Sequence, residues 1–243
     1  NAVCTFILID PESPVDSRTL YVCEYGRGVY KSTDAGSTWQ LKAEGLGDNR
    51  NAWRMVRLPS GKLFLLVARG KKKHTGYVDG ALYTSVDRAG TWHELPLPQG
   101  VNAPNDLVYD PEDPERMYLC CWPWMKDGRE LCGGLLRTED GGESWKRVFN
   151  EQAHVYAAAV DKDNPATVFI NTFEKGAYRS DDRGENWYRL AGYNFKWGHR
   201  PVPDPHNPGM LYLTTFGGSL FYGPAEGVPG AAEDIENLPP FNW

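Results

Sequence analysis

Short stretches of alternating apolar and polar residues, each bounded by turn-forming residues, recur along the whole chain. Four of them follow turns that begin with Asp and end with Pro, an arrangement typical of β-strands entered from tight turns. The turns span residues 10–14, 110–114, 161–165 and 204–208, and the strands after them centre on Tyr21, Tyr118, Phe169 and Tyr212. Residues 58–62 form a comparable turn. Strands before these turns, starting near Val3, Trp53, Asp106, Val155 and Arg200, predict five strand groups.

An octapeptide of the pattern Ser/Thr-x-Asp-x-Gly-x-Ser/Thr-Trp occurs four times, at residues 32–39, 85–92, 138–145 and 180–187. The copies start 53, 53 and 42 residues apart, roughly the period of β-propeller blades. The second copy has Ala89 in place of the Gly, and the fourth has Asn186 in place of Ser or Thr. We expect those two turns to be slightly strained or reshaped.

The residue types of the octapeptide predict a folding device rather than a catalytic one. Its Asp can accept hydrogen bonds from its own turn, its Gly supplies a positive φ, and its Trp is expected to fill the gap beneath the next layer. The structural aspartates predicted in this way are Asp34, Asp87, Asp140 and Asp182.

Together these patterns predict an all-β fold: a β-propeller of about five four-stranded blades with the last blade incomplete. We expect one propeller domain over residues 1–224, followed by a C-terminal tail over 225–243. The blades are expected near residues 1–45, 46–98, 99–150, 151–192 and 193–224. A fifth octapeptide is missing after residue 224. The five blades therefore close without that strand, or self-association or additional blades complete the propeller.

The octapeptide resembles the Asp-box, or BNR, repeat of sialidases, xyloglucanase-type glycoside hydrolases, sortilin-type receptor ectodomains and photosystem II assembly factors. The four copies span most of the chain, so the resemblance implies the Asp-box β-propeller fold. Members of this superfamily differ in activity, and the shared residues are the structural ones.

Charge and hydropathy exclude several function classes. The net charge is −6, which disfavours a general nucleic-acid binder because phosphate contacts need a basic face. The mean hydropathy is −0.54, and no apolar run reaches the roughly 18 residues of a membrane-spanning helix.

Five cysteines and the start of the chain bear on its compartment. Disulfides could join Cys4 to Cys23 and Cys121 to Cys132 if the protein is exported. Alternatively, the thiols could be free and buried. The chain starts without Met or a signal peptide, as a mature or excised fragment does. We expect a secreted, periplasmic or extracellular protein. The cysteine spacing predicts no zinc or other metal, and no motif calls for a cofactor.

Two insertions, residues 69–79 and 122–131, stand out because the other loops joining second to third strands are short. In propellers these loops and the starts of the inner strands gather on one face, where ligands usually bind. The residues of this face that could act as acid, base or their partners are Asp106, Asp79, Glu130, His154 and His199.

Other residues of this predicted face suit an anionic or polyhydroxylated ligand. Arg54, Arg69 and Arg200 could clamp a carboxylate. The aromatic candidates for stacking on a sugar ring are Trp53, Trp122, Trp124, Trp197 and Tyr156.

These residues favour a carbohydrate-binding or glycan-processing propeller, glycoside hydrolase-like if it is an enzyme. One alternative is a non-enzymatic scaffold or protein-recognition module, which would show an exposed apolar patch instead of facing carboxylates. Another is an acidic-polysaccharide lyase that uses His, Arg, Tyr156 and Tyr77. The partner expected first is a carbohydrate.

Overall fold

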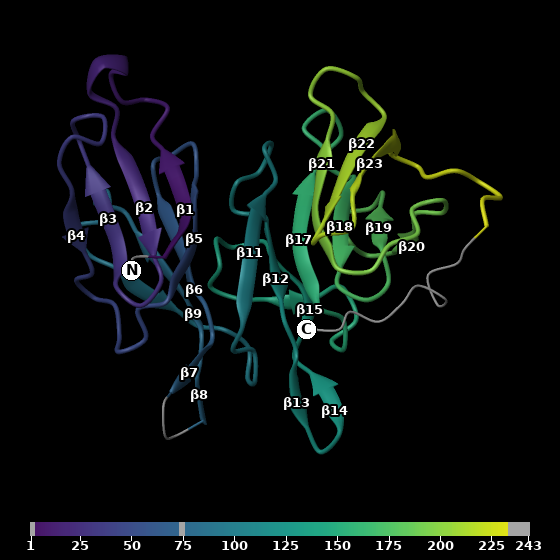
Figure 1. The fold of residues 1–243 in the computed structure, drawn as a ribbon, viewed down its shortest axis with the longest axis horizontal. Coiled ribbons are helices and arrows are strands. Elements are labelled where there is room, and N and C mark those ends of the chain that lie inside the picture. The colour runs from purple at the N-terminus through teal and green to yellow at the C-terminus, as the bar shows by residue number, and fades with distance from the viewer. Residues whose placement is uncertain (1–2, 73–75, 233–243) are drawn as a thin grey trace. The chain divides into compact units, whose positions relative to one another are not determined.

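Among the residues that the computed structural model describes, the regular elements are β-strands apart from one short 3-10 turn, Val15–Ser17 (Figure 1). The structure describes residues 3–72 and 76–232. Two compact units divide the chain: unit 1 comprises Asn1–Asn105 with Asp140–Ser144, and unit 2 comprises Asp106–Glu139 with Trp145–Trp243. The all-β prediction is confirmed, and no helix in the described ranges is long and apolar enough to cross a membrane.

Unit 1 holds two four-stranded antiparallel sheets and a hairpin. The first sheet consists of β1 (Cys4–Ile9), β2 (Leu20–Glu24), β3 (Gly28–Ser32) and β4 (Gln40–Lys42). The second consists of β5 (Ala52–Arg57), β6 (Leu63–Val67), β9 (Ala81–Ser85) and β10 (His93–Leu95). The hairpin β7 (Gly70–Lys72) and β8 (Gly76–Val78) extends from the end of β6.

Unit 2 holds most of the third sheet and all of the fourth and fifth. The third sheet consists of β11 (Pro104–Tyr109), β12 (Met117–Cys121), β15 (Gly134–Thr138) and β16 (Lys146–Arg147). Its hairpin is β13 (Trp124–Lys126) and β14 (Arg129–Leu131). The fourth consists of β17 (Val155–Val160), β18 (Val168–Thr172), β19 (Ala177–Ser180) and β20 (Tyr188–Arg189). The fifth has three strands within the described residues: β21 (Gly198–Pro203), β22 (Met210–Thr215) and β23 (Leu220–Pro224).

Antiparallel order within each sheet decides which loops share an end. The turn between the first and second strands and the Asp-box turn between the third and fourth lie at one end, while the insertions lie at the other. The first strands begin within two residues of the predicted positions, at Cys4, Ala52, Pro104, Val155 and Gly198. Those strand predictions are confirmed.

Each Asp-box aspartate is held by hydrogen bonds inside its own turn. Asp34 accepts from the Ser32 hydroxyl at 2.7 Å and from the Thr38 backbone N–H at 2.8 Å. Equivalent bonds from a backbone N–H reach Asp87, Asp140 and Asp182 at 2.8 to 2.9 Å. The four box aspartates are therefore turn-forming acceptors, as the sequence predicts.

Hydrogen bonding to the ionised carboxylates makes the fold sensitive to acid. The hydroxyl and N–H of Thr38 lower the pKa of Asp34 from 3.8 to about 2, and the N–H and amide of Asn186 do the same for Asp182. Because these folded-state pKa values lie below the ordinary one, the stabilisation is present above pH 4 and is lost as the pH falls toward 2. We expect the urea midpoint to fall across that interval. The fall in the urea midpoint should be smaller for Asp182→Asn than for the unaltered protein. An equal fall in the two proteins would contradict the assignment of the acid sensitivity to the box carboxylates.

The box tryptophans do not all occupy the environment predicted for them. Trp92 is 1% exposed, and its indole packs on the preceding first sheet rather than on the next layer. Trp187 likewise bonds to the preceding third sheet. Trp39, however, is 40% exposed in the structure of residues 3–72 and 76–232. The prediction that its side chain fills a gap beneath the next layer is therefore wrong. The reason is that no described sheet precedes the first sheet in unit 1.

No disulfide joins any of the five cysteines, all of which lie in the described residues, so neither disulfide considered from the sequence forms. Cys23, Cys120 and Cys121 are buried. Burial raises the pKa of Cys121 to about 12 and raises that of Cys23 further. These two thiols therefore remain protonated and unreactive at neutral pH.

Candidate functional site

Loops at the insertion end of unit 2 are tied together by backbone hydrogen bonds. The Phe173 N–H, just after β18, donates to the His154 carbonyl just before β17 at 2.9 Å. The Phe216 N–H, just after β22, donates to the Trp197 carbonyl just before β21, also at 2.9 Å. Trp122 follows β12 at the same end of the third sheet. The residues at these strand ends are thereby held in defined positions.

Aromatic rings from these loops form one continuous cluster. The Trp122 indole stacks on the His154 imidazole with centroids 5.4 Å apart and planes 15° apart. Phe173 lies 5.4 Å from Trp122, and Phe216 lies 6.1 Å from Phe173. Tyr156, 7% exposed, lies 4.7 Å from Phe216 and forms the buried part of the cluster. We call Trp122, His154, Phe173, Phe216 and Tyr156 the aromatic platform.

Two carboxylates contact opposite nitrogens of the His154 ring. Nε2 lies 3.3 Å from Oε1 of Glu130, which is carried by β14, and Nδ1 contacts Oε1 of Glu174 in the loop after β18. The side chains of Glu130 and Glu174 are 35% and 42% exposed, so both can also reach a bound ligand. The arrangement places acidic, basic and aromatic groups side by side.

Asp106 and Arg200 form an ion pair in the same unit. Asp106 is 1% exposed, and its Oδ2 lies 3.4 Å from Nη2 of Arg200 on β21. The Leu107 N–H donates to its other oxygen at 3.0 Å. The ring of His199, the residue before Arg200, lies 4.9 Å from the ring of Tyr156 in the platform. His199 also shares a hydrogen bond of 3.1 Å with the Thr214 hydroxyl.

A pocket of about 210 Å³ opens beside the two glutamates. Glu130, Glu174, Lys175 and Tyr178 are among its lining residues. Burial raises the pKa of Tyr178, so its hydroxyl stays protonated and remains a hydrogen-bond donor. The pocket therefore combines carboxylate acceptors with an ammonium and a phenol donor.

The site residues that the sequence predicts in unit 1 form a hydrogen-bonded group of their own. Arg69 donates to Asn102 at 3.1 Å, and Asn102 donates to Asp79 at 2.8 Å. The Arg69 guanidinium lies 5.6 Å from the centre of the Tyr77 ring, which is 65% exposed. Of the same insertion, residues 73–75 lie outside the described residues. Unit 1 thus presents an aromatic residue backed by a positioned cation.

The other sequence candidates have more local surroundings. Arg54, next to Trp53 on β5, lies over the Phe6 ring at 5.3 Å. Trp124 is on β13, where Lys126 lies 5.6 Å from its ring. The suggested carboxylate clamp of Arg54, Arg69 and Arg200 stays a prediction. No group of three or more His, Cys, Asp or Glu side chains is placed to hold a metal in the part of the chain that the structure describes.

Sequence reasoning missed three residues of the site, namely Glu174, Phe173 and Phe216. A signal for two of them was present, because Trp122, Phe173 and Phe216 each directly follow the second strand of a sheet. Aligning the chain by strand instead of by box would have placed these aromatic residues in one row. Glu174 sits in a short loop with no distinguishing pattern.

Four Asp-box turns on successive antiparallel sheets, with aromatic and acidic residues at the opposite strand ends, define an Asp-box β-propeller protein. The model of the family described as Sortilin-Vps10 (sortilin, neurotensin receptor 3) matches residues 27–177, and the chain belongs to that family.

Curated relatives and solved structures agree with this class. The chain is 34% identical over 125 residues to a probable oligoxyloglucan-reducing end-specific xyloglucanase of Neosartorya fischeri, covering 44% of the chain and 14% of the relative. It is 28% identical over 193 residues to the xyloglucanase Xgh74A of Acetivibrio thermocellus, covering 75% and 22%. The chain thus spans less than a quarter of the length of these relatives.

The solved structures share the fold at low sequence identity. The GH74 xyloglucanase from Xanthomonas campestris has a TM-score of 0.68 at 18% identity, covering 96% of this chain and 39% of that one. YCF48 bound to D1 peptide has a TM-score of 0.58 at 14% identity, covering 88% and 66%.

Proposed function

We propose that the protein binds a polysaccharide through the aromatic platform and processes it as a glycoside hydrolase-like protein. The observation that carries this proposal is the stacked Trp122–His154 pair flanked by Glu130 and Glu174. Flat aromatic faces stack on the apolar faces of sugar rings, while carboxylates accept hydrogen bonds from sugar hydroxyls. Xyloglucan is the first substrate to test, because the curated relatives are xyloglucanases.

Within this proposal, Glu130 and Glu174 supply the two carboxylates that glycoside hydrolysis needs, one as acid and one as base or nucleophile. His154, between them, can pass a proton from one carboxylate to the other and so restore both after a turnover. Asp106, whose charge is balanced by Arg200, is the third carboxylate to test.

The five large sheets are proposed to be five blades of one propeller over residues 1–224, the fifth lacking an outer strand. We also propose that the protein is secreted, because a protein that acts on a polysaccharide outside the cell must reach that polysaccharide. A protein-recognition role is the alternative, and YCF48 bound to D1 peptide is a precedent for it on this fold.

Trp122→Ala is expected to weaken binding of xyloglucan oligosaccharides at least 30-fold. Removing a central aromatic contact commonly costs about 2 kcal/mol or more of binding free energy, and about 1.4 kcal/mol corresponds to tenfold. Isothermal titration calorimetry measures the affinities. Trp39→Ala, an exposed tryptophan of unit 1, is the matched control and should leave affinity unchanged. Absence of binding by the unaltered protein would overturn the proposal and favour the recognition role.

A further inference from the structure

A basic residue near the end of a third strand reaches into a neighbouring Asp-box in each unit. In unit 1 the Lys31 ammonium donates to the Arg88 carbonyl in the second box at 3.0 Å. In unit 2 the Arg137 guanidinium donates to the Arg183 carbonyl in the fourth box at 2.6 Å. Lys31 and Arg137 each lie opposite a tyrosine of the second strand of their sheet, and Arg88 and Arg183 are each the fourth residue of their box. The surroundings of these two contacts can therefore be compared position by position.

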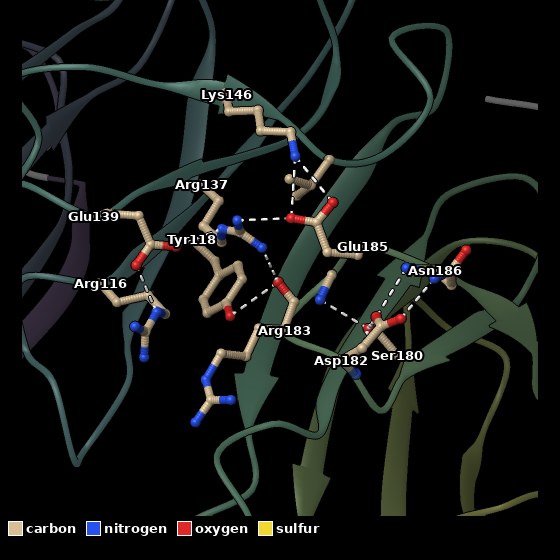
Figure 2. Close-up of polar contacts among 12 residues, drawn as sticks. Arg116, Tyr118, Arg137, Glu139, Lys146, Ser180, Asp182, Arg183, Glu185 and Asn186 are labelled. Atoms are coloured by element: carbon tan, nitrogen blue, oxygen red, sulfur yellow. Dashed lines mark hydrogen bonds and ion pairs between the residues drawn. The ribbon is translucent and has the colours of Figure 1, made fainter.

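In unit 2 the cations around this contact are neutralised by carboxylates of the boxes (Figure 2). Glu185, the sixth residue of the fourth box, lies 2.8 Å from Nη2 of Arg137 and 2.9 Å from Nζ of Lys146. Glu139, the second residue of the third box, lies 2.8 Å from Nε of Arg137 and 2.7 Å from Nε of Arg116. Lys146 and Arg137 hold the pKa of Glu185 below its usual value. Positive and negative groups thus balance each other in unit 2.

Unit 1 has neutral residues at the positions of these two glutamates. The second residue of the first box is Thr33, and the sixth residue of the second box is Gly90. In the described part of unit 1, no carboxylate forms an ion pair with Lys31 or Arg88. An ammonium carries three N–H donors, and within the same residues that of Lys31 spends one, on the Arg88 carbonyl. The contact in unit 1 therefore keeps its cations and lacks the box carboxylates.

Lys42 adds a third positive charge beside this contact. Lys42 pairs with Val29 across β3 and β4, two positions before Lys31, so Lys42 and Lys31 share one face of the first sheet. The Trp92 indole N–H of the second box donates to the Lys42 carbonyl at 3.1 Å. In unit 2 the corresponding carbonyl acceptor belongs to Val148, an uncharged residue. We call Lys31, Lys42 and Arg88 the cationic cluster.

Neighbouring carboxylates do not neutralise the cationic cluster. Burial lowers the pKa of Lys31, and repulsion by the other two members of the cluster lowers it further. Attraction by Asp10 and Asp87 has a smaller effect than this repulsion. Asp10 lies 3.3 Å from Nε of Arg57, and Asp87 is held by hydrogen bonds inside its own turn. The cluster therefore carries a positive charge that unit 1 does not balance.

We propose that the cationic cluster binds a carboxylate of an acidic segment in a partner protein. Unit 2 points to this ligand, because glutamate side chains carried by polypeptide turns occupy the corresponding place against Arg137 and Lys146. Lys and Arg bind carboxylates through charge-assisted hydrogen bonds. The second box lies at the end of its sheet opposite the insertion 69–79. This interaction is therefore additional to polysaccharide binding and does not rest on the proposed function.

Fluorescence anisotropy of a labelled tetraglutamate peptide tests the proposal at low ionic strength, where surface charges are least screened. Arg88→Gln should weaken binding about threefold to fivefold, the effect expected of one exposed ion pair. Lys146→Gln is the matched control and should leave the affinity unchanged, because Lys146 is already paired with Glu185. Absence of peptide binding by the unaltered protein overturns the proposal. Equal weakening in the two variants also overturns it, because overall charge would then explain the binding.

A second pair of variants restores the missing carboxylate. Thr33→Glu places a carboxylate at the position of Glu139 and should weaken peptide binding at least about fivefold, because it competes for Lys31 and repels the peptide. Thr33→Gln adds similar bulk without charge and should leave the affinity unchanged. Equal affinities of the two Thr33 variants would contradict the assignment of the peptide to this cluster.

Two further measurements identify the source of the carboxylate. Oligogalacturonate that binds more tightly than the peptide, with the same loss in Arg88→Gln, would overturn the partner protein and assign the cluster to an acidic polysaccharide. Sedimentation velocity that shows a dimer lost in Arg88→Gln would instead assign the cluster to a second copy of the chain. Binding of xyloglucan oligosaccharides should be the same in Arg88→Gln as in the unaltered protein, and a loss there would overturn the separation of the two sites.

Discussion

Replacing Trp92 by alanine is expected to lower the free energy of unfolding by about 3–5 kcal/mol, the usual cost of truncating a fully buried large aromatic residue. Trp92 is 1% exposed and belongs to a core cluster that includes Tyr21, Met55 and Leu65. The substitution also removes the hydrogen bond to the Lys42 carbonyl and leaves that acceptor between two sheets. Urea denaturation monitored by circular dichroism measures the loss.

Trp39→Ala is the matched control, because it alters the same position of the repeat in the first box. With 40% of the residue exposed, we expect a loss below about 1 kcal/mol. Similar losses for the two variants would show that the box tryptophans act within their own turns, and would contradict the role assigned to packing between sheets.

Glu130→Gln and Glu174→Gln are each expected to lower turnover of xyloglucan about 10²- to 10⁴-fold, the range that general acid or base catalysis supplies. The amide keeps the shape of the side chain and one acceptor oxygen, but it cannot accept or release the proton. Reducing-end release measures turnover, and calorimetry should show that binding of oligosaccharides changes much less than turnover does.

Glu112→Gln controls for the loss of one carboxylate, because Glu112 is exposed in a turn at the opposite end of the third sheet. It should leave turnover unchanged. Full turnover in both site variants would remove the two glutamates from the chemistry and leave Asp106 as the carboxylate to test. Formation of an unsaturated product by the unaltered protein would instead favour the lyase alternative.

The strands and box turns could be predicted because their information is local. Alternation of apolar and polar residues identifies a strand, and the hydrogen bonds of Asp34 or Asp182 lie within four residues of the aspartate. The environment of a box tryptophan is different, since Trp39 and Trp92 have the same local sequence pattern and opposite burial. Burial of that residue depends on whether another sheet lies against it.

In the candidate site, too, local features could be predicted and contacts between distant residues could not. The sequence indicated Trp122, Glu130 and His154 because two of them lie in a conspicuous insertion and the third precedes a predicted strand. It gave no reason to pair Glu130 with Glu174, which is 44 positions away and meets it only through His154.

By itself, the sequence determined the β-strands, the four Asp-box turns and the end of each sheet where the insertions lie, since these follow from alternation, turn chemistry and antiparallel order. The tertiary structure alone decided which tryptophans are buried, that Arg200 pairs with Asp106, and that one imidazole lies between two glutamates. Those contacts join residues of different sheets, and their distances depend on how the sheets pack within a unit, which no local pattern encodes.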